Sequence, residues 1–138
     1  MEQARVEIGN QQSKYGKVNS LMQYINEGTL LVQHKIQPSG KAVGIDKVTK
    51  EMYQENLCEN LKKLIEDMKK FSYRPLPVER KYIPKGEGKF RPLGIPSYED
   101  KIVQGAFRDI LDIIYEPKFY DFSYGFRKGK DCHQAILQ

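Results

Sequence analysis

Apolar residues recur every three to four positions in three segments of the chain, which predicts three amphipathic helices. The first covers residues 17–33 and is interrupted near Gly28. The second covers residues 50–71 with Thr49 as its N-cap, and the third covers residues 98–115 after a variant capping box that begins at Ser97. Residues 1–16 are polar with only scattered apolar positions, so we expect a loose N-terminal arm.

Two short strands are predicted between the second and third helices. Residues 74–77 (RPLP) end the preceding helix, because each proline forces the residue before it into an extended conformation. Residues 78–84 and 89–95 are then expected to pair as a hairpin, since Gly86 and Gly88 can supply the positive φ that a hairpin loop needs. The sequence therefore predicts an α+β fold with N-terminal helices, a long helix, a β-hairpin or small antiparallel sheet, and an amphipathic helix.

The last twenty residues combine an aromatic loop with the start of another helix. Residues 119–130 (FYDFSYGFRKGK) are aromatic and basic and are expected to form an ordered loop, after which Asp131 can cap a helix that reaches Gln138. That helix would begin with no apolar partner following it in the sequence. We therefore expect exposed apolar surface there and a tendency to self-associate.

Positive charge is concentrated in one part of the chain. The net charge of the 138 residues is +5, yet residues 62–91 contain ten Lys or Arg against four acids and carry +6, which leaves about −1 for the rest. A local cluster of this kind favours an anionic partner such as nucleic acid. A solvated charged face remains an equally ordinary interpretation of such a run.

Cysteine, histidine and hydropathy indicate an intracellular protein without a metal site. Cys58 and Cys132 are far apart and form no CxxC pair, which argues against a disulfide framework. His34 is isolated and His133 adjoins Cys132, so we assign these residues structural or surface roles rather than zinc ligation. The sequence has neither an apolar stretch long enough to span a membrane nor the pattern of a signal peptide, and we expect a cytoplasmic location.

The predicted hairpin is the best candidate for a binding site. Lys89 and Arg91 share strand parity and should project from one face, while Lys85 stands at the other side of the loop. A lysine provides a point charge and an arginine a bidentate fork, a combination that suits a polyphosphate. An ordinary surface hairpin with solubilising charges is equally compatible with this pattern.

Several motifs resemble those of group II intron reverse transcriptases, which also act as maturases. Residues 73–95 resemble the fingers hairpin of this family, and residues 97–104 (SYEDKIVQ) resemble the helix start that follows it. The segments 115–119 (YEPKF) and 123–127 (SYGFR), together with Gly44-Ile45-Asp46 and Thr49, match further family motifs in the same order. Lys47 and Lys128 depart from the family, which usually has glycine and proline at these positions.

The resemblance implies a domain organisation. Residues 1–16 would be the polar arm, residues 17–43 an N-terminal extension that binds template or intron RNA, and residues 44–138 the fingers region, ending at the start of the palm. The family's metal-binding aspartate and its Tyr-x-Asp-Asp motif would lie beyond Gln138. We therefore expect no catalytic residue and no bound metal in these residues, with Mg²⁺ serving the full-length enzyme.

The resemblance also implies roles for individual side chains. Lys85 and Arg91 would contact the triphosphate of the incoming nucleotide, and Phe126 would shape the pocket near the nucleotide and template base. Contacts with the nucleic-acid backbone are expected from a second group of cations: Arg80, Lys81, Lys89 and Arg127. Phosphate contacts of this type position the nucleic acid without reading its sequence.

Two functional hypotheses follow. In the first, the chain is the fingers portion of an RNA-directed DNA polymerase, a nucleotidyltransferase of retroelements that uses an RNA template, a DNA primer and dNTPs, and is inactive by itself. In the second, it is a stand-alone basic module that binds group II intron RNA for splicing, without polymerase activity. The sequence does not identify the host intron or the RNA element.

Overall fold

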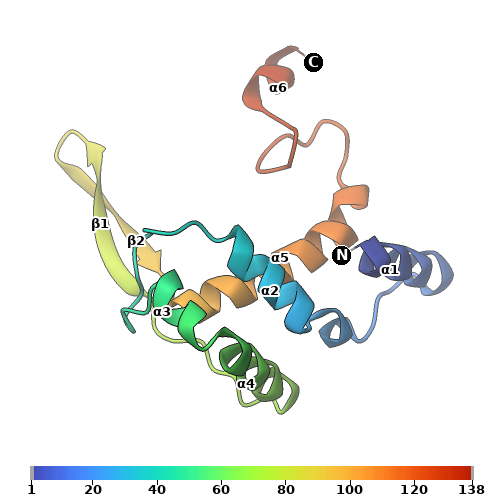
Figure 1. Cartoon of the computed structure of the whole chain (residues 1–138). Helices are drawn as coiled ribbons and strands as arrows, with labels where there is room; N and C mark the ends of the chain where they lie inside the picture. Colours follow the sequence, from blue (N-terminus) through green and yellow to red (C-terminus); the bar gives the residue numbers. More distant parts are fainter. Residues whose placement is uncertain (1, 138) are drawn as a thin grey trace. The chain divides into compact units, whose positions relative to one another are not determined.

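The computed structural model describes residues 2–137 (Figure 1). The helices are α1 (Glu2–Tyr15), α2 (Glu27–Ile36), α3 (Lys50–Glu55), α4 (Leu57–Lys69), α5 (Tyr98–Tyr115) and α6 (Cys132–Leu137), with 3₁₀ turns η1 (Leu21–Tyr24) and η2 (Glu116–Lys118). Strands β1 (Glu79–Gly86) and β2 (Lys89–Ile95) form a two-stranded antiparallel sheet. This combination of helices with a small sheet confirms the α+β prediction. No helix within residues 2–137 is long and apolar enough to cross a membrane.

The chain divides into two compact units. One comprises residues 21–107, and the other comprises the described parts of residues 1–20 and 108–138. Helix α5 begins in the first unit and ends in the second. The expected division into residues 1–16, 17–43 and 44–138 stays a prediction.

The unit of residues 21–107 has a core built from one face of each helix. Helix α2 packs against α4, and the beginning of α5 contributes a third apolar face. The fully buried side chains of this core include Ile25 before α2, Leu30 on α2, Leu64 on α4 and Ile102 on α5. Burying an aliphatic side chain of this size contributes about 1.5–3 kcal/mol, so these helices depend on one another for stability.

A buried polar network joins α2, α3 and α5 in the same unit. His34 on α2 is buried, and its Nε2 lies against Oε1 of Gln54 while its Nδ1 lies 2.9 Å from the hydroxyl of Tyr98. With the proton on Nε2, the ring donates to Gln54 and accepts from Tyr98. The ring also packs edge-on against Tyr98, with centroids 5.9 Å apart. His34 thus has a core role, and burial raises the pKa of Tyr98 to about 12.

Two of the predicted helices begin or end elsewhere. Within residues 17–33 the only α-helical part starts at Glu27, because Asn26 and Thr29 form a reciprocal capping box. Gly28 therefore lies in the first turn of α2 and does not interrupt a longer helix. The segment predicted over residues 50–71 is capped by Thr49 as expected, but it breaks at Asn56 into α3 and α4.

Gly44 brings two distant segments into backbone contact. A Cβ at residue 44 would lie 2.7 Å from Cα of Ser97 and 2.8 Å from the oxygen of Pro96. Only glycine allows this approach, which fixes residues 44–47 against the start of α5. In the turn that follows, the amide of Lys47 donates to the carbonyl of Gly44, and Lys47 adopts φ +57°. A glycine at this position would adopt this φ more easily.

The second unit begins with a helix rather than the loose arm expected for residues 1–16. Ala4 and Ile8 of α1 are buried, and Nε2 of Gln12 donates to the carbonyl of Ile114 at 3.1 Å. The few apolar positions of this polar segment are thus sufficient to dock it. The final helix α6 starts after Asp131, whose carboxylate caps it through the amide of Gln134 at 2.8 Å, as predicted.

Candidate nucleic-acid interface

The hairpin β1–β2 extends away from the helices of its unit (Figure 1). Its strands are joined by a two-residue turn, shorter than the four-residue loop predicted. Glu87 and Gly88 have φ +50° and +71°, which fits the requirement of a type I′ turn for positive φ at both central residues. The pairing register shifts between Pro84 and Gly86, which leaves Lys85 at a bulge without a cross-strand partner.

The register divides the predicted cations between two faces. Ile83 pairs with Arg91 and Lys81 pairs with Leu93, so Lys81 and Arg91 share one face. Lys89 is two residues from Arg91 on the same strand and therefore joins this face. The sequence prediction that Lys89 and Arg91 project together agrees with the observed register.

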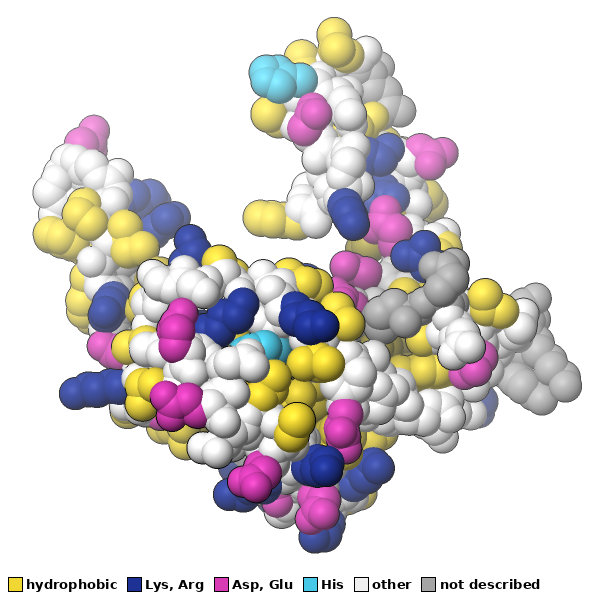
Figure 2. All heavy atoms as spheres, in the orientation of Figure 1, with side chains coloured by type: hydrophobic (Ala, Val, Ile, Leu, Met, Phe, Trp, Pro, Cys, Tyr) yellow, Lys and Arg dark blue, Asp and Glu magenta, His cyan; other side chains and the backbone are white. Residues whose placement is uncertain are grey.

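Arg80 belongs to the opposite face, because it pairs with Gly94 and alternates with Lys81. The same face carries Tyr82, Pro84, Phe90 and Pro92, which the register places as two adjacent cross-strand pairs. Figure 2 shows both hydrophobic and basic side chains along the hairpin. The structure thus separates a basic face from an aromatic face, a division that we did not anticipate.

The basic face is largely unneutralised. Lys81 lies 4.0 Å from Glu79 and Lys89 lies 3.7 Å from Glu87, and all four side chains are solvent-exposed. Exposed pairs at such separations contribute little, typically about 0–1 kcal/mol. Among the residues that the structure describes, no ion pair involves Lys85 or Arg91. These cations are available to an anionic ligand.

Asp100 anchors the segment that leads into the hairpin. Its side chain is only 3% exposed; Oδ1 accepts from the hydroxyl of Tyr73, and Oδ2 accepts from the amide of Leu76 at 3.1 Å. The amide of Asp100 donates to Oγ of Ser97 at 3.2 Å, so Ser97 is the N-cap, as the capping-box prediction required. The carboxylate of Asp100, however, accepts its hydrogen bonds from Tyr73 and Leu76, and not from the backbone amide of the N-cap residue as in a complete capping box.

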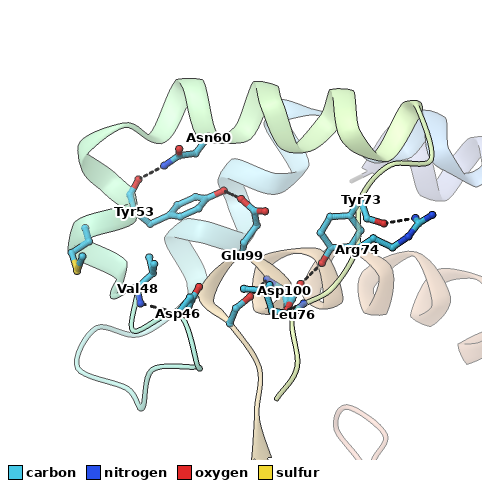
Figure 3. A pocket seen from close by; sticks show the side chains of 11 residues that line it. Asp46, Val48, Tyr53, Asn60, Tyr73, Arg74, Leu76, Glu99 and Asp100 are labelled. Carbon is cyan, nitrogen blue, oxygen red and sulfur yellow. Dashed lines mark hydrogen bonds between the residues drawn. The ribbon is translucent and has the colours of Figure 1, made fainter. Parts of the chain in front are cut away.

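A pocket of about 330 Å³ lies beside this anchor (Figure 3). The hydroxyl of Tyr53 donates to Oε2 of Glu99 at 2.9 Å, and the hydroxyl of Tyr73 likewise donates to the carboxylate of Asp100. Burial raises the pKa of Glu99, and burial followed by the nearby carboxylates raises the pKa values of Tyr53 and Tyr73. Both tyrosines therefore remain hydrogen-bond donors at neutral pH.

The carboxylates of this pocket do not suit a catalytic metal. Within residues 2–137, no group of three or more His, Cys, Asp or Glu side chains converges as ligands. The oxygens of Asp100 and Glu99 already accept hydrogen bonds from Tyr73, Leu76 and Tyr53. The Mg²⁺ ion expected for the full-length enzyme stays a prediction.

The remaining predicted site residues, Phe126 and Arg127, lie in the loop of the other unit. Phe126 has φ +59° and is fully exposed, with a relative accessibility of 113%. The side chain of Arg127 is only 11% exposed: Nε and Nη2 donate to Glu116 at 3.0 and 2.8 Å, and Nη1 donates to the carbonyls of Tyr120 and Ser123. Arg127 therefore organises the loop, and its contact with nucleic acid stays a prediction.

Sequence reasoning missed two kinds of residue. The contact of Gly44 with Ser97 and the bond of Tyr73 to Asp100 join segments more than twenty residues apart, and no local pattern reveals them. The aromatic face had a detectable signal, because Tyr82 and Phe90 occupy alternating positions of short strands.

The family relationship follows from similarity to known proteins. Over 79 residues the chain is 51% identical to the group II intron-encoded protein LtrA of Lactococcus lactis subsp. cremoris, a match that covers 56% of this chain and 13% of LtrA. This chain is homologous to the group II intron-encoded proteins. The resemblance that the sequence motifs indicated is thereby confirmed.

Two further relatives match at lower identity. Protein YkfC of Escherichia coli (strain K12) is 45% identical over 93 residues, which cover 67% of this chain and 24% of YkfC. A COX1/OXI3 intron 2 protein of Saccharomyces cerevisiae is 42% identical over 78 residues, which cover 56% of this chain and 9% of that protein. The chain thus spans about a quarter or less of the length of these relatives. No family model matches the chain.

Proposed function

We propose that the chain is the fingers region of an RNA-directed DNA polymerase of the group II intron type and that its hairpin binds phosphate groups. The observation that carries the proposal is the basic face of the hairpin, where exposed cations lack effective acidic partners. The kinship with intron-encoded proteins supports an RNA as the partner.

Different cations have different roles in this proposal. Lys85 and Arg91 bind the triphosphate of the incoming nucleotide, Lys85 as a point charge at the bulge and Arg91 as a bidentate fork on the adjacent strand. Lys81 and Lys89 contact the backbone of template or intron RNA from the same face, and Arg80 contacts it from the other face. Phe126 shapes the nucleotide pocket. Primer, dNTP and Mg²⁺ engage the longer protein.

The experiment is a salt titration of RNA binding by the 138-residue chain, followed by fluorescence anisotropy. Each phosphate neutralised on a single strand contributes about 0.7 to the slope of log K against log salt. A triple variant that removes the three hairpin charges assigned to the RNA backbone should lower this slope by about 2. The substitutions are Arg80→Gln, Lys81→Gln and Lys89→Gln.

A matched control removes three exposed lysines that lie in the same basic segment, residues 62–91, but outside the hairpin. Its substitutions are Lys62→Gln, Lys69→Gln and Lys70→Gln. The control should keep most of the salt slope if the hairpin is the interface. An equal loss of slope in both variants would mean that the whole basic segment acts as a diffuse surface. A wild-type affinity that does not change between about 50 and 200 mM salt would refute phosphate binding.

A further inference from the structure

The face of the hairpin opposite the basic face carries two exposed aromatic rings. Tyr82 and Phe90 are 63% and 64% exposed. Tyr82 pairs with Pro92, and Pro84 pairs with Phe90, so the two rings are diagonal neighbours on one face. Diagonal neighbours on an antiparallel pair lie about 7–8 Å apart between Cα atoms, within reach of the same short segment of ligand.

The surroundings of these rings determine which ligand fits. Pro84 and Pro92 pair with the two aromatic residues and add apolar surface to the face, while Arg80 lies on the same face and Lys85 at the bulge near its end. An apolar protein partner would gain nothing from these cations. A single-stranded nucleic acid offers base planes to the rings and phosphates to the cations at the same time.

We propose that the Tyr82–Phe90 face is a stacking platform for unpaired bases of single-stranded RNA. This inference rests on the proposed function, because it assigns a second face of the same hairpin to the same class of ligand. Stacking on aromatic rings does not depend on base identity, so the platform holds RNA of any sequence. One face of the hairpin then binds phosphate alone, and the opposite face binds bases together with the phosphates that its own cations contact.

The test compares two oligomers of about ten nucleotides, within the range of about 4–16 that such sites occupy. One is oligo(U), whose bases are unstacked, and the other is an abasic ribose-phosphate chain of equal length and charge. The wild-type chain should bind oligo(U) about tenfold or more tightly than the abasic chain, because stacking adds to the phosphate contacts. Phosphate contacts alone would give equal affinities.

Substitutions then assign the difference to the two rings. Tyr82→Leu and Phe90→Leu should each weaken oligo(U) binding about five- to tenfold, with the slope of the salt titration unchanged. Tyr82→Phe keeps the ring and should keep the affinity. Phe71→Leu is the matched control, because Phe71 is an exposed aromatic residue after α4, outside the hairpin.

The outcomes distinguish this inference from the proposed function. Equal binding of oligo(U) and the abasic chain, or no effect of either leucine variant, would overturn the stacking platform and leave phosphate binding intact. No binding of either oligomer would overturn both. If the wild-type chain dimerises in sedimentation and Tyr82→Leu restores a monomer with unchanged RNA affinity, the face serves a second copy of the chain and the inference is wrong.

Discussion

Removing the carboxylate of Asp100 should release the segment that leads into the hairpin. In the structure this side chain accepts one hydrogen bond from the hydroxyl of Tyr73 and one from the amide of Leu76. Asp100→Ala leaves the hydroxyl of Tyr73 and the amide of Leu76 without their acceptor. The site is almost fully buried, because Asp100 itself is only 3% exposed. A hydrogen bond to a charged group contributes about 1.5–3 kcal/mol, so two of them give about 3–6 kcal/mol.

The expected value lies near the lower end of this range. Tyr73 is only half-buried, so water can replace part of its lost bond. A loss of about 3 kcal/mol is still a large part of the roughly 5–15 kcal/mol by which domains are stable. Urea unfolding followed by circular dichroism measures the change, and hydrogen exchange at the amide of Leu76 shows whether the segment opens locally.

Asp100→Asn is the matched control for this prediction. An asparagine can direct its oxygen to the amide of Leu76 and its NH₂ group to the hydroxyl of Tyr73, which can act as an acceptor. It loses the charge but keeps both bonds, so the cost should be about 1 kcal/mol. The reasoning would be refuted if Asp100→Ala cost less than about 1 kcal/mol, or if both variants cost the same.

Three further predictions concern the same unit. Gly44→Ala should destabilise the chain by about 1–3 kcal/mol in urea unfolding, because the new Cβ meets the backbone of Ser97; an unchanged midpoint would contradict the close approach. Lys47→Gly should raise the midpoint of thermal unfolding, since glycine removes a cost of about 1 kcal/mol at φ +57°. Burial raises the pKa of Glu99 above its ordinary value, so the folded state holds this proton more tightly than the unfolded state does. The free energy of unfolding should therefore fall as pH rises from about 4.5 and the proton is released. Glu99→Gln should reduce this dependence in unfolding measured from pH 4.5 to 7, and an identical dependence in both proteins would disprove the assignment.

The sequence predicted those features whose causes are local. The hairpin followed from its glycines, helix α5 from its apolar period and the capping serine at 97, and α6 from Asp131. Each of these signals lies within a few residues of the structure that it specifies. The family relationship was also accessible, because it depends on motifs that can be read in order along the chain.

Features that depend on distant residues were missed or placed wrongly. Helix α1 was expected to be loose, because only Ala4 and Ile8 reveal its buried side, and the helix belongs to a unit that it shares with residues far away in the sequence. The break at Asn56 has no proline or glycine to announce it. In the candidate site, the residue types were evident, but whether Arg80 or Lys81 shares a face with Arg91 depended on pairing register. Register is set by the turn, and we predicted a longer loop than the one observed.

The two-stranded sheet has a consequence for the solubility of the chain. Within residues 2–137 no third strand pairs with β1 or β2, so each presents an outer edge that another chain could extend into a growing sheet. Pro84 and Pro92 interrupt the row of backbone donors, and the lysines repel a second ribbon of like charge. The cations assigned to phosphate thus also protect the ribbon against aggregation. Replacing them all with uncharged residues should promote precipitation, whereas replacement with glutamate would remove RNA binding and preserve the repulsion.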